Sequence, residues 1–345
     1  MIKLTERKRS ILLMVVREYI ETGQPVSSNH LVDNCMLDLS PATIRAELSA
    51  LTEMGLLRQP HTSAGRVPTE EGYRLFINEV IPISDLADPD KLAIRSQFDS
   101  SRADMGDWIQ TAARVLARKS SAVSVITAPR AMQNKYKHVE LLSINGRQIF
   151  MVLVLIGGEV IQRYISLSEP VLQDRLGEAA KNLNRICAGK TLEKLTSLDL
   201  SAEPLEDDIL AVIKAEIRRV DTNGIGKLYY DGLANLRAVP QESDTNAVYR
   251  AIDMLDEGSS LGRIMGISAD GLQPAGTVQV MIGVEDALHP LKDFSMVYSN
   301  YGIPGKLSGA LGVLGPMRMP YNQAIPTVRF IANVLSDFLA SNYIE

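Results

Sequence analysis

The apolar positions of residues 40–55 have the spacing of one helical face. That face consists of residues at i, i+4 and i+7, namely Ile44, Leu48 and Leu51. Ser40 is a suitable N-cap because its hydroxyl can accept a hydrogen bond from the first turn, and Pro41 suits the first helical position, where no backbone donor is needed. We therefore predict an amphipathic helix that begins after Ser40 and ends near Gly55.

The opposite face of this helix carries small or polar side chains. They are Ala42, Thr43, Arg45, Ala46, Ser49 and Glu53. Small outward residues allow a helix to lie deep in the DNA major groove, where arginine can bind guanine edges and alanine or threonine methyl groups can contact a thymine methyl. An ordinary amphipathic helix with a solvated surface has the same pattern, so the neighbouring elements must decide between the two interpretations.

The neighbouring patterns favour DNA binding. Helices are predicted at 6–21 and 28–35 before the central helix, and a hairpin of strands 56–59 and 66–68 and a helix at 70–81 after it. Helix, helix, turn, helix and hairpin is the order of a winged helix-turn-helix domain. The polar hairpin tip, or wing, runs from His61 to Gly65.

The rest of the chain predicts a larger α+β region. Helices are expected at 107–119, 172–187, 204–220, 246–257 and 321–342, with a possible short helix between 82 and 105. Strands are expected at 122–127, 148–156, 159–167, 277–283, 294–301 and 308–314, and a short apolar piece at 227–230 lies between the helices of the insert. Asn145-Gly146 is a strong hairpin signal, and it predicts a three-stranded antiparallel meander that ends at residue 167.

We predict a multidomain α+β fold in which one domain interrupts another. The expected divisions are a winged-helix domain at 1–82, a linker at 83–105, an α+β domain in two parts at 106–169 and 276–345, and a mostly helical insert at 170–275. A hydrophobic content of 46% over 345 residues is sufficient for several cores.

Composition and charge refine this picture. The longest apolar run, 149–156, is too short to span a bilayer, and Cys35 and Cys187 are too few and too far apart for a disulfide framework, so we expect a cytoplasmic protein with no membrane segment. The net charge is −5, and residues 1–80 contain nine basic and ten acidic residues. A single near-neutral domain should bind DNA weakly, so we expect two copies to act together.

The sequence offers no set of residues for catalysis or metal binding. Its four histidines and two cysteines are scattered, Gly305-Lys306 lacks the remaining residues of a phosphate loop, and there is no Gly-x-Ser-x-Gly motif. We expect neither an enzyme nor a cofactor or metal site.

Three segments of the sequence resemble the HrcA family of bacterial heat-inducible transcription repressors. They are TERKRSILLMVVREYIETGQPVSS at 5–28, LSPATIRAELSALTEMGLLRQPHTSAGRVPTEEGYRLFI at 39–77 and GVLGPMRMPYNQAIPTVRFIANVLSDFL at 312–339. Pro320 stands where the family usually has aspartate, and Gly232-Leu233-Ala234-Asn235 departs from the family's Gly-Thr-Ser-Asn.

The resemblance implies a winged helix, a GAF-like domain split by an inserted dimerisation domain, and a dimer that binds double-stranded DNA at an inverted-repeat operator called CIRCE, ahead of chaperonin and chaperone operons. It also implies that the chaperonin GroEL keeps the repressor active. The expected DNA-binding residues are Ser40, Ala42, Thr43, Arg45, Ala46 and Ser49 on the reading helix, His61, Thr62, Ser63, Gly65 and Arg66 on the wing, and Arg7 and Lys8 on the first helix. Arg45 is expected to read bases, and Arg7, Lys8, Arg66 and the wing to contact phosphates or the minor groove.

A metabolite-sensing winged-helix repressor with a small-molecule pocket in the GAF-like domain is the alternative. Its meander and glycine-rich strands could line such a pocket, but they offer few convergent polar groups.

Overall fold

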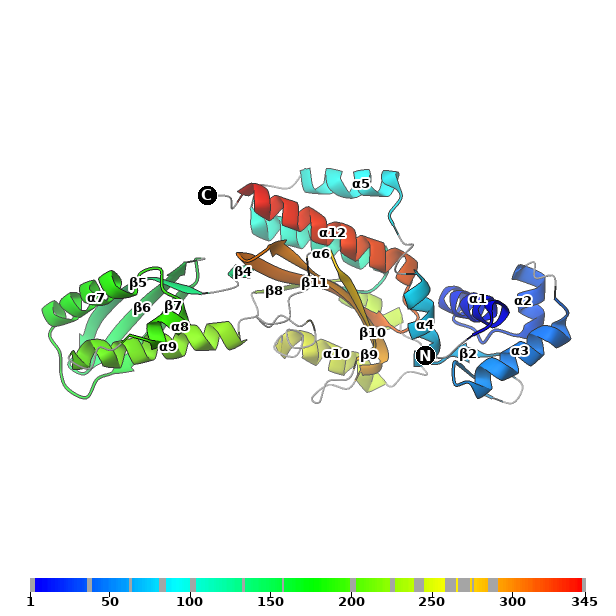
Figure 1. Cartoon of the computed structure of the whole chain (residues 1–345), viewed down its shortest axis with the longest axis horizontal. Helices are drawn as coiled ribbons and strands as arrows, with labels where there is room; N and C mark the ends of the chain where they lie inside the picture. The colour runs from blue at the N-terminus through cyan, green and yellow to red at the C-terminus, as the bar shows by residue number, and fades with distance from the viewer. Residues whose placement is uncertain are drawn as a thin grey trace.

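The computed structural model is a mixed helix and sheet fold whose parts lie in a row (Figure 1). It describes residues 4–35, 39–61, 64–80, 85–99, 104–131, 134–156, 158–198, 203–223, 227–238, 245–257, 265, 274, 276–284 and 291–342. The N-terminal elements lie at one end of the row, a large sheet with its helices lies in the middle, and a smaller sheet with three helices lies at the other end.

The N-terminal part has the predicted order of elements. It consists of α1 (Glu6–Thr22), α2 (Ser28–Cys35), α3 (Pro41–Glu53), β1 (Leu57–Arg58), β2 (Val67–Pro68) and α4 (Glu70–Val80). Ile44, Leu48 and Leu51 of α3 are buried against α1, as their spacing predicted. The Ser40 hydroxyl accepts a hydrogen bond from the Thr43 amide at 3.1 Å, which confirms the predicted N-cap.

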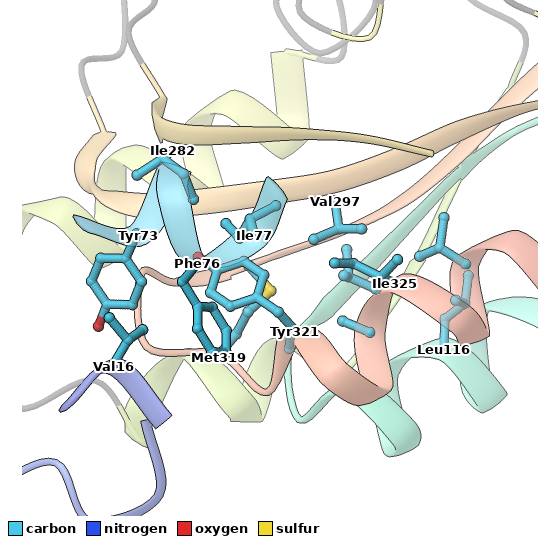
Figure 2. Close-up of a cluster of buried hydrophobic side chains, with 14 of the residues drawn as sticks. Val16, Tyr73, Phe76, Ile77, Leu116, Ile282, Val297, Met319, Tyr321 and Ile325 are labelled. Atoms are coloured by element: carbon cyan, nitrogen blue, oxygen red, sulfur yellow. The ribbon is translucent and has the colours of Figure 1, made fainter. Parts of the chain in front are cut away.

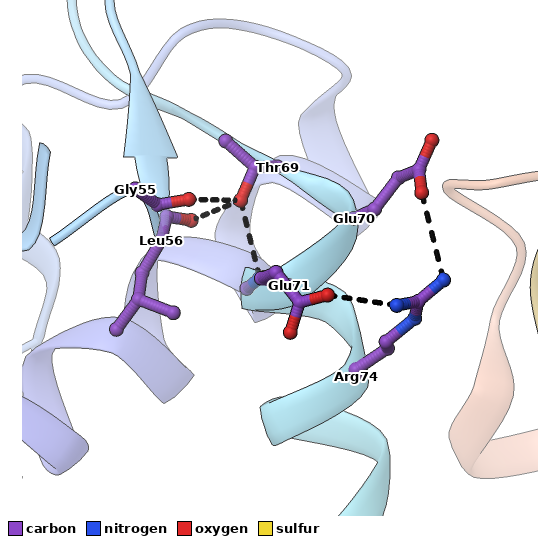
Figure 3. A network of polar contacts seen from close by, with 7 residues as sticks. Gly55, Leu56, Thr69, Glu70, Glu71 and Arg74 are labelled. Atoms are coloured by element: carbon purple, nitrogen blue, oxygen red, sulfur yellow. Dashed lines mark hydrogen bonds and ion pairs between the residues drawn. The ribbon is translucent and has the colours of Figure 1, made fainter. Parts of the chain in front are cut away.

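Thr69 joins the end of α3 to the beginning of α4 (Figure 3). Its hydroxyl donates to the carbonyl oxygens of Gly55 at 2.7 Å and Leu56 at 3.0 Å, and it accepts from the Gly72 amide at 3.2 Å. One side chain therefore satisfies backbone groups on both sides of the hairpin and fixes where α4 starts.

The predicted linker contains a packed helix, α5 (Asp88–Asp99). Its Ile94 and Phe98 are buried, and the Phe98 ring lies 5.0 Å from that of Trp108 on α6 (Met105–Ser120). The segment is thus more than a spacer, because Ile94 and Phe98 are covered by the central part of the molecule.

The central part is a six-stranded antiparallel sheet. Its strand order is β8-β3-β11-β10-β9, with β4 paired to β11. The strands are β3 (Val123–Thr127), β4 (Arg130–Ala131), β8 (Leu228–Asp231), β9 (Val278–Val284), β10 (Leu291–Ile303) and β11 (Leu307–Pro316). One face packs on α6 and α12 (Tyr321–Asn342), and the other on η1 (Leu233–Ala238) and α10 (Thr245–Glu257).

The meander forms a second, three-stranded sheet that is separate from the central one. It contains β5 (Lys135–Asn145), β6 (Gln148–Ile156) and β7 (Val160–Ser166). One face is covered by α7 (Gln173–Cys187), α8 (Leu192–Thr196) and α9 (Pro204–Asn223), and together they have a core of their own. The side chain of Asn184 links α7 to the sheet. Its Oδ1 accepts a hydrogen bond from the Val139 amide at 2.8 Å, and its Nδ2 donates to the Val139 carbonyl at 3.0 Å.

This arrangement differs from the expected division of the α+β domain. The meander was expected within 106–169 with the central strands, but it packs with the helices of the insert, whereas β8 and α10 from the expected insert pack with the central sheet. The separate unit therefore spans 135–223. Alternating polar and apolar residues predict a half-buried strand but do not indicate which sheet the strand joins.

The N-terminal part packs against the central sheet through a shared apolar cluster (Figure 2). Its labelled members include Val16 of α1, Tyr73, Phe76 and Ile77 of α4, Met319 just before α12, and Tyr321 and Ile325 in the first turns of α12. The rings of Tyr73 and Tyr321 lie 6.2 Å apart.

Within the described parts of the chain, no helix is long and apolar enough to cross a membrane.

Candidate nucleic-acid interface

The outward face of α3 carries the side chains that were predicted to contact DNA. Ala42, Arg45 and Ala46 are exposed, and Thr43 and Ser49 are half-buried at the edges of this face. Arg45 has no hydrogen-bond or ion-pair partner among the described residues, so its guanidinium is available to an external acceptor. Ser40 has a structural role here, since its hydroxyl caps the helix and lies 2.9 Å from the Thr43 hydroxyl.

Arg7 and Lys8 flank a carboxylate on α3. Lys8 Nζ lies 2.9 Å and Arg7 Nη1 3.8 Å from the carboxylate oxygens of Glu47, whose side chain is mostly buried. The two cations neutralise Glu47, whose charge would otherwise repel DNA phosphates. Nothing in the sequence indicated this pairing, because residues about forty positions apart show no pattern in a linear sequence.

The hairpin is bonded to α3 and to the segment between α1 and α2. Arg66 pairs with Val26 through two backbone hydrogen bonds of 2.8 and 2.9 Å, and Arg66 Nε donates to the Thr52 hydroxyl of α3 at 3.0 Å. Gln59 Nε2 donates to the Ala64 carbonyl at 3.0 Å across the base of the tip. His61 is exposed at the tip, whereas the predicted contacts Thr62 and Ser63 lie outside the described residues. Val26 and Thr52 thus hold the hairpin, through Arg66, at a fixed distance from α3.

Gly65 is the point of closest approach between the hairpin and the Val26 segment. A Cβ atom at Gly65 would lie 2.5 Å from the carbonyl carbon and oxygen of Val26, so Gly65→Ala should force the wing away from its anchor. We expect a loss of about 1–3 kcal/mol in the free energy of unfolding, measured by urea titration.

Gly177 provides the matched control for this substitution. It lies inside α7, and a Cβ atom there would have no neighbour within 4 Å. Gly177→Ala should therefore stabilise the chain by about 0.5–1 kcal/mol. Equal effects of the two substitutions would contradict the close approach at Gly65.

A hollow of about 320 Å³ separates α3 from the hairpin and the start of α2. Two larger hollows, of about 570 and 590 Å³, lie where neighbouring parts of the molecule meet. The first is between the central sheet and the separate unit, beside Arg130 and Asp221, and the second is between α1, α4 and the start of α12. The described residues show no cluster that could hold a metal ion.

The comparisons with known proteins agree with this organisation. Residues 106–325 match the family model described as the HrcA protein C-terminal domain. The chain belongs to the HrcA family. A heat-inducible transcription repressor HrcA from Roseiflexus sp. (strain RS-1) is 37% identical over 350 residues, which cover 99% of this chain and 96% of that protein. The HrcA of Roseiflexus castenholzii is 38% identical over 351 residues, again with 99% and 96% covered.

A solved structure shares this fold along nearly the whole chain. A crystal structure described as that of a hypothetical protein superposes with a TM-score of 0.61 at 24% sequence identity, and the match covers 98% of this chain and 99% of that one. The curated HrcA proteins are named as transcription repressors, not enzymes, which agrees with the absence of a catalytic motif in the sequence.

Proposed function

We propose that this HrcA family member is a winged-helix repressor that binds an inverted-repeat operator of the CIRCE type ahead of chaperone genes. The observation that carries this proposal is the outward face of α3, where Arg45, which has no partner among the described residues, lies between small side chains beside an anchored hairpin. The names of the relatives support repression and heat induction.

The expected contacts divide into reading and positioning groups. Arg45 reads base edges in the major groove, and Ala42, Thr43, Ala46 and Ser49 shape the contact. The wing from His61 to Gly65 lies at the neighbouring minor groove, and Arg7, Lys8 and Arg66 contact phosphates. Because Arg7 and Lys8 also pair with Glu47, their contribution to phosphate affinity is smaller than their charges alone would give.

Two copies are required for a two-fold operator, and the outer face of the meander supplies the proposed contact between them. This dimer face contains exposed or half-buried apolar side chains from all three strands, including Leu142, Ile144, Phe150, Val160 and Tyr164. The rings of Phe150 and Tyr164 lie 5.0 Å apart on neighbouring strands. Exposed apolar side chains gathered on neighbouring strands are typical of an interaction surface, and an isologous contact would cover them with the same side chains of a second copy.

The GAF-like character of the central domain, the dimerising role of the separate unit and the dependence on the chaperonin GroEL are parts of the same proposal. An exposed apolar face on a partly assembled repressor is a surface that a chaperonin can bind. Unfolded proteins that occupy the chaperonin after heating would then leave less active repressor on the operator.

Titration of inverted-repeat DNA and random duplex DNA with the purified chain tests the proposal. Arg45→Ala should cost about 1–3 kcal/mol of binding free energy on the operator and less on random DNA. Equal losses on both duplexes would instead assign Arg45 to phosphate. Repeating the operator titration with added chaperonin tests the regulatory part, and an unchanged occupancy at every temperature would contradict it.

A further inference from the structure

The geometry of duplex DNA places a strong constraint on the space between α3 and the hairpin. One sugar-phosphate strand separates the major groove from the neighbouring minor groove. If α3 lies in the major groove and the wing in the minor groove, this strand must pass between them. The inference below rests on the proposed function, because it takes that placement of α3 and the wing as given.

The hollow of about 320 Å³ lies in this space. Arg45 and Leu48 of α3 form one wall, Gln59 and Arg66 of the hairpin form the other, and Ser27 closes the end at the start of α2. Two of the residues that line the hollow are arginines, and none is acidic. Among the described residues, neither Arg45 nor Arg66 forms an ion pair, so both charges act on whatever enters the hollow.

The polar groups of the hollow are oriented but not fully satisfied. Arg66 is held by its Nε bond to Thr52, which leaves its terminal nitrogens for an acceptor. Ser28 is only 8% exposed and lines the hollow, and its hydroxyl has no hydrogen-bond partner in the described part of the chain. The first amides of α2 lie at the same end, where a helix favours an anion.

We infer that this hollow is the seat of the sugar-phosphate strand between the two grooves, and that Ser27, Ser28 and Gln59 contact phosphate together with Arg66. Such contacts fix the position of α3 on the duplex without reading its sequence. The seat explains why the hairpin is anchored both to α3 and to the segment before α2. These bonds fix the distance between hairpin and helix, as a sugar-phosphate strand of constant width requires.

Ser27 allows a sharp test of the seat. Its hydroxyl accepts a hydrogen bond from the His30 amide at 3.2 Å, which is an N-cap that aspartate and asparagine provide equally well. Ser27→Asp and Ser27→Asn should therefore both fold, but only the first adds a negative charge to the seat. We expect Ser27→Asp to weaken binding of operator and random duplex by the same factor, about tenfold, and Ser27→Asn by less than about twofold.

A second pair of variants, at Gln59 on the opposite wall, shows whether the loss of binding depends on charge or on a local folding defect at Ser27. Gln59→Glu and Gln59→Met both lose the hydrogen bond to Ala64 and have similar size, so they differ mainly in charge. The glutamate variant should weaken binding of both duplexes, and the methionine variant should not. Melting temperatures of all four variants serve as the folding control.

The possible outcomes separate this inference from the proposed function. If the aspartate and glutamate variants bind as well as their neutral partners while the unaltered chain binds the operator, the seat is wrong and the repressor function stands. A loss confined to the operator would also overturn the seat, because it would indicate base contacts. If the unaltered chain binds neither duplex, the proposed function fails, and the seat fails with it.

Discussion

Tyr164→Lys is expected to lower operator affinity by about 10²–10⁴-fold while the chain stays folded. Tyr164 is 73% exposed and lies on the dimer face beside Phe150, so a lysine there does not disturb a core. In an isologous contact each substitution occurs twice, and two added charges would have to be buried against apolar side chains. Each copy would then bind a half-site alone, with the weak affinity of a near-neutral domain.

Leu92→Lys is the control for this prediction. Leu92 is 67% exposed and lies on α5, which packs against α6 of the central part and not against the meander, so its replacement should change neither the mass of the assembly nor the affinity. Sedimentation gives the oligomeric state, and a gel shift with inverted-repeat DNA gives the affinity. A Tyr164→Lys chain that remains dimeric and binds the operator normally would assign the dimer contact to another surface.

Tyr321→Ala is expected to lower the free energy of unfolding by about 3–5 kcal/mol. Tyr321 is fully buried at the start of α12, where its ring faces Tyr73 of α4 and its hydroxyl donates to the Met317 carbonyl at 2.8 Å. Burial raises the pKa of this phenol, so the hydroxyl stays protonated and the hydrogen bond persists at physiological pH. Removing the Tyr321 ring leaves a cavity in the cluster between the N-terminal part and the central sheet (Figure 2).

Urea unfolding measures this effect, and hydrogen exchange locates it. Amides of α1 and α4 should exchange faster in Tyr321→Ala because these helices pack against the cluster that contains Tyr321. Tyr321→Phe keeps the ring and loses only the hydrogen bond, so it should cost about 1 kcal/mol. If the alanine and phenylalanine variants lost equal stability, packing of the ring would not be the main contribution of Tyr321.

The sequence alone predicted the local elements well, because their signals are local. Ser40 caps α3 as expected, the order from α1 to α4 matches the predicted order, and Asn145-Gly146 joins two paired strands. Caps, helical spacing and hairpin turns depend on residues within a few positions of one another, so they can be recognised without the fold. The residues expected on the outer side of α3 are also there.

Only the tertiary structure decided how these elements combine. It placed the meander with α7, α8 and α9, returned β8 to the central sheet, paired Lys8 with Glu47, and tied Arg66 to Thr52 across the hollow. Each of these contacts joins residues that are distant in the chain and compatible with several partners. A periodic pattern determines which face of an element is buried, but the packing of the whole chain determines what buries it.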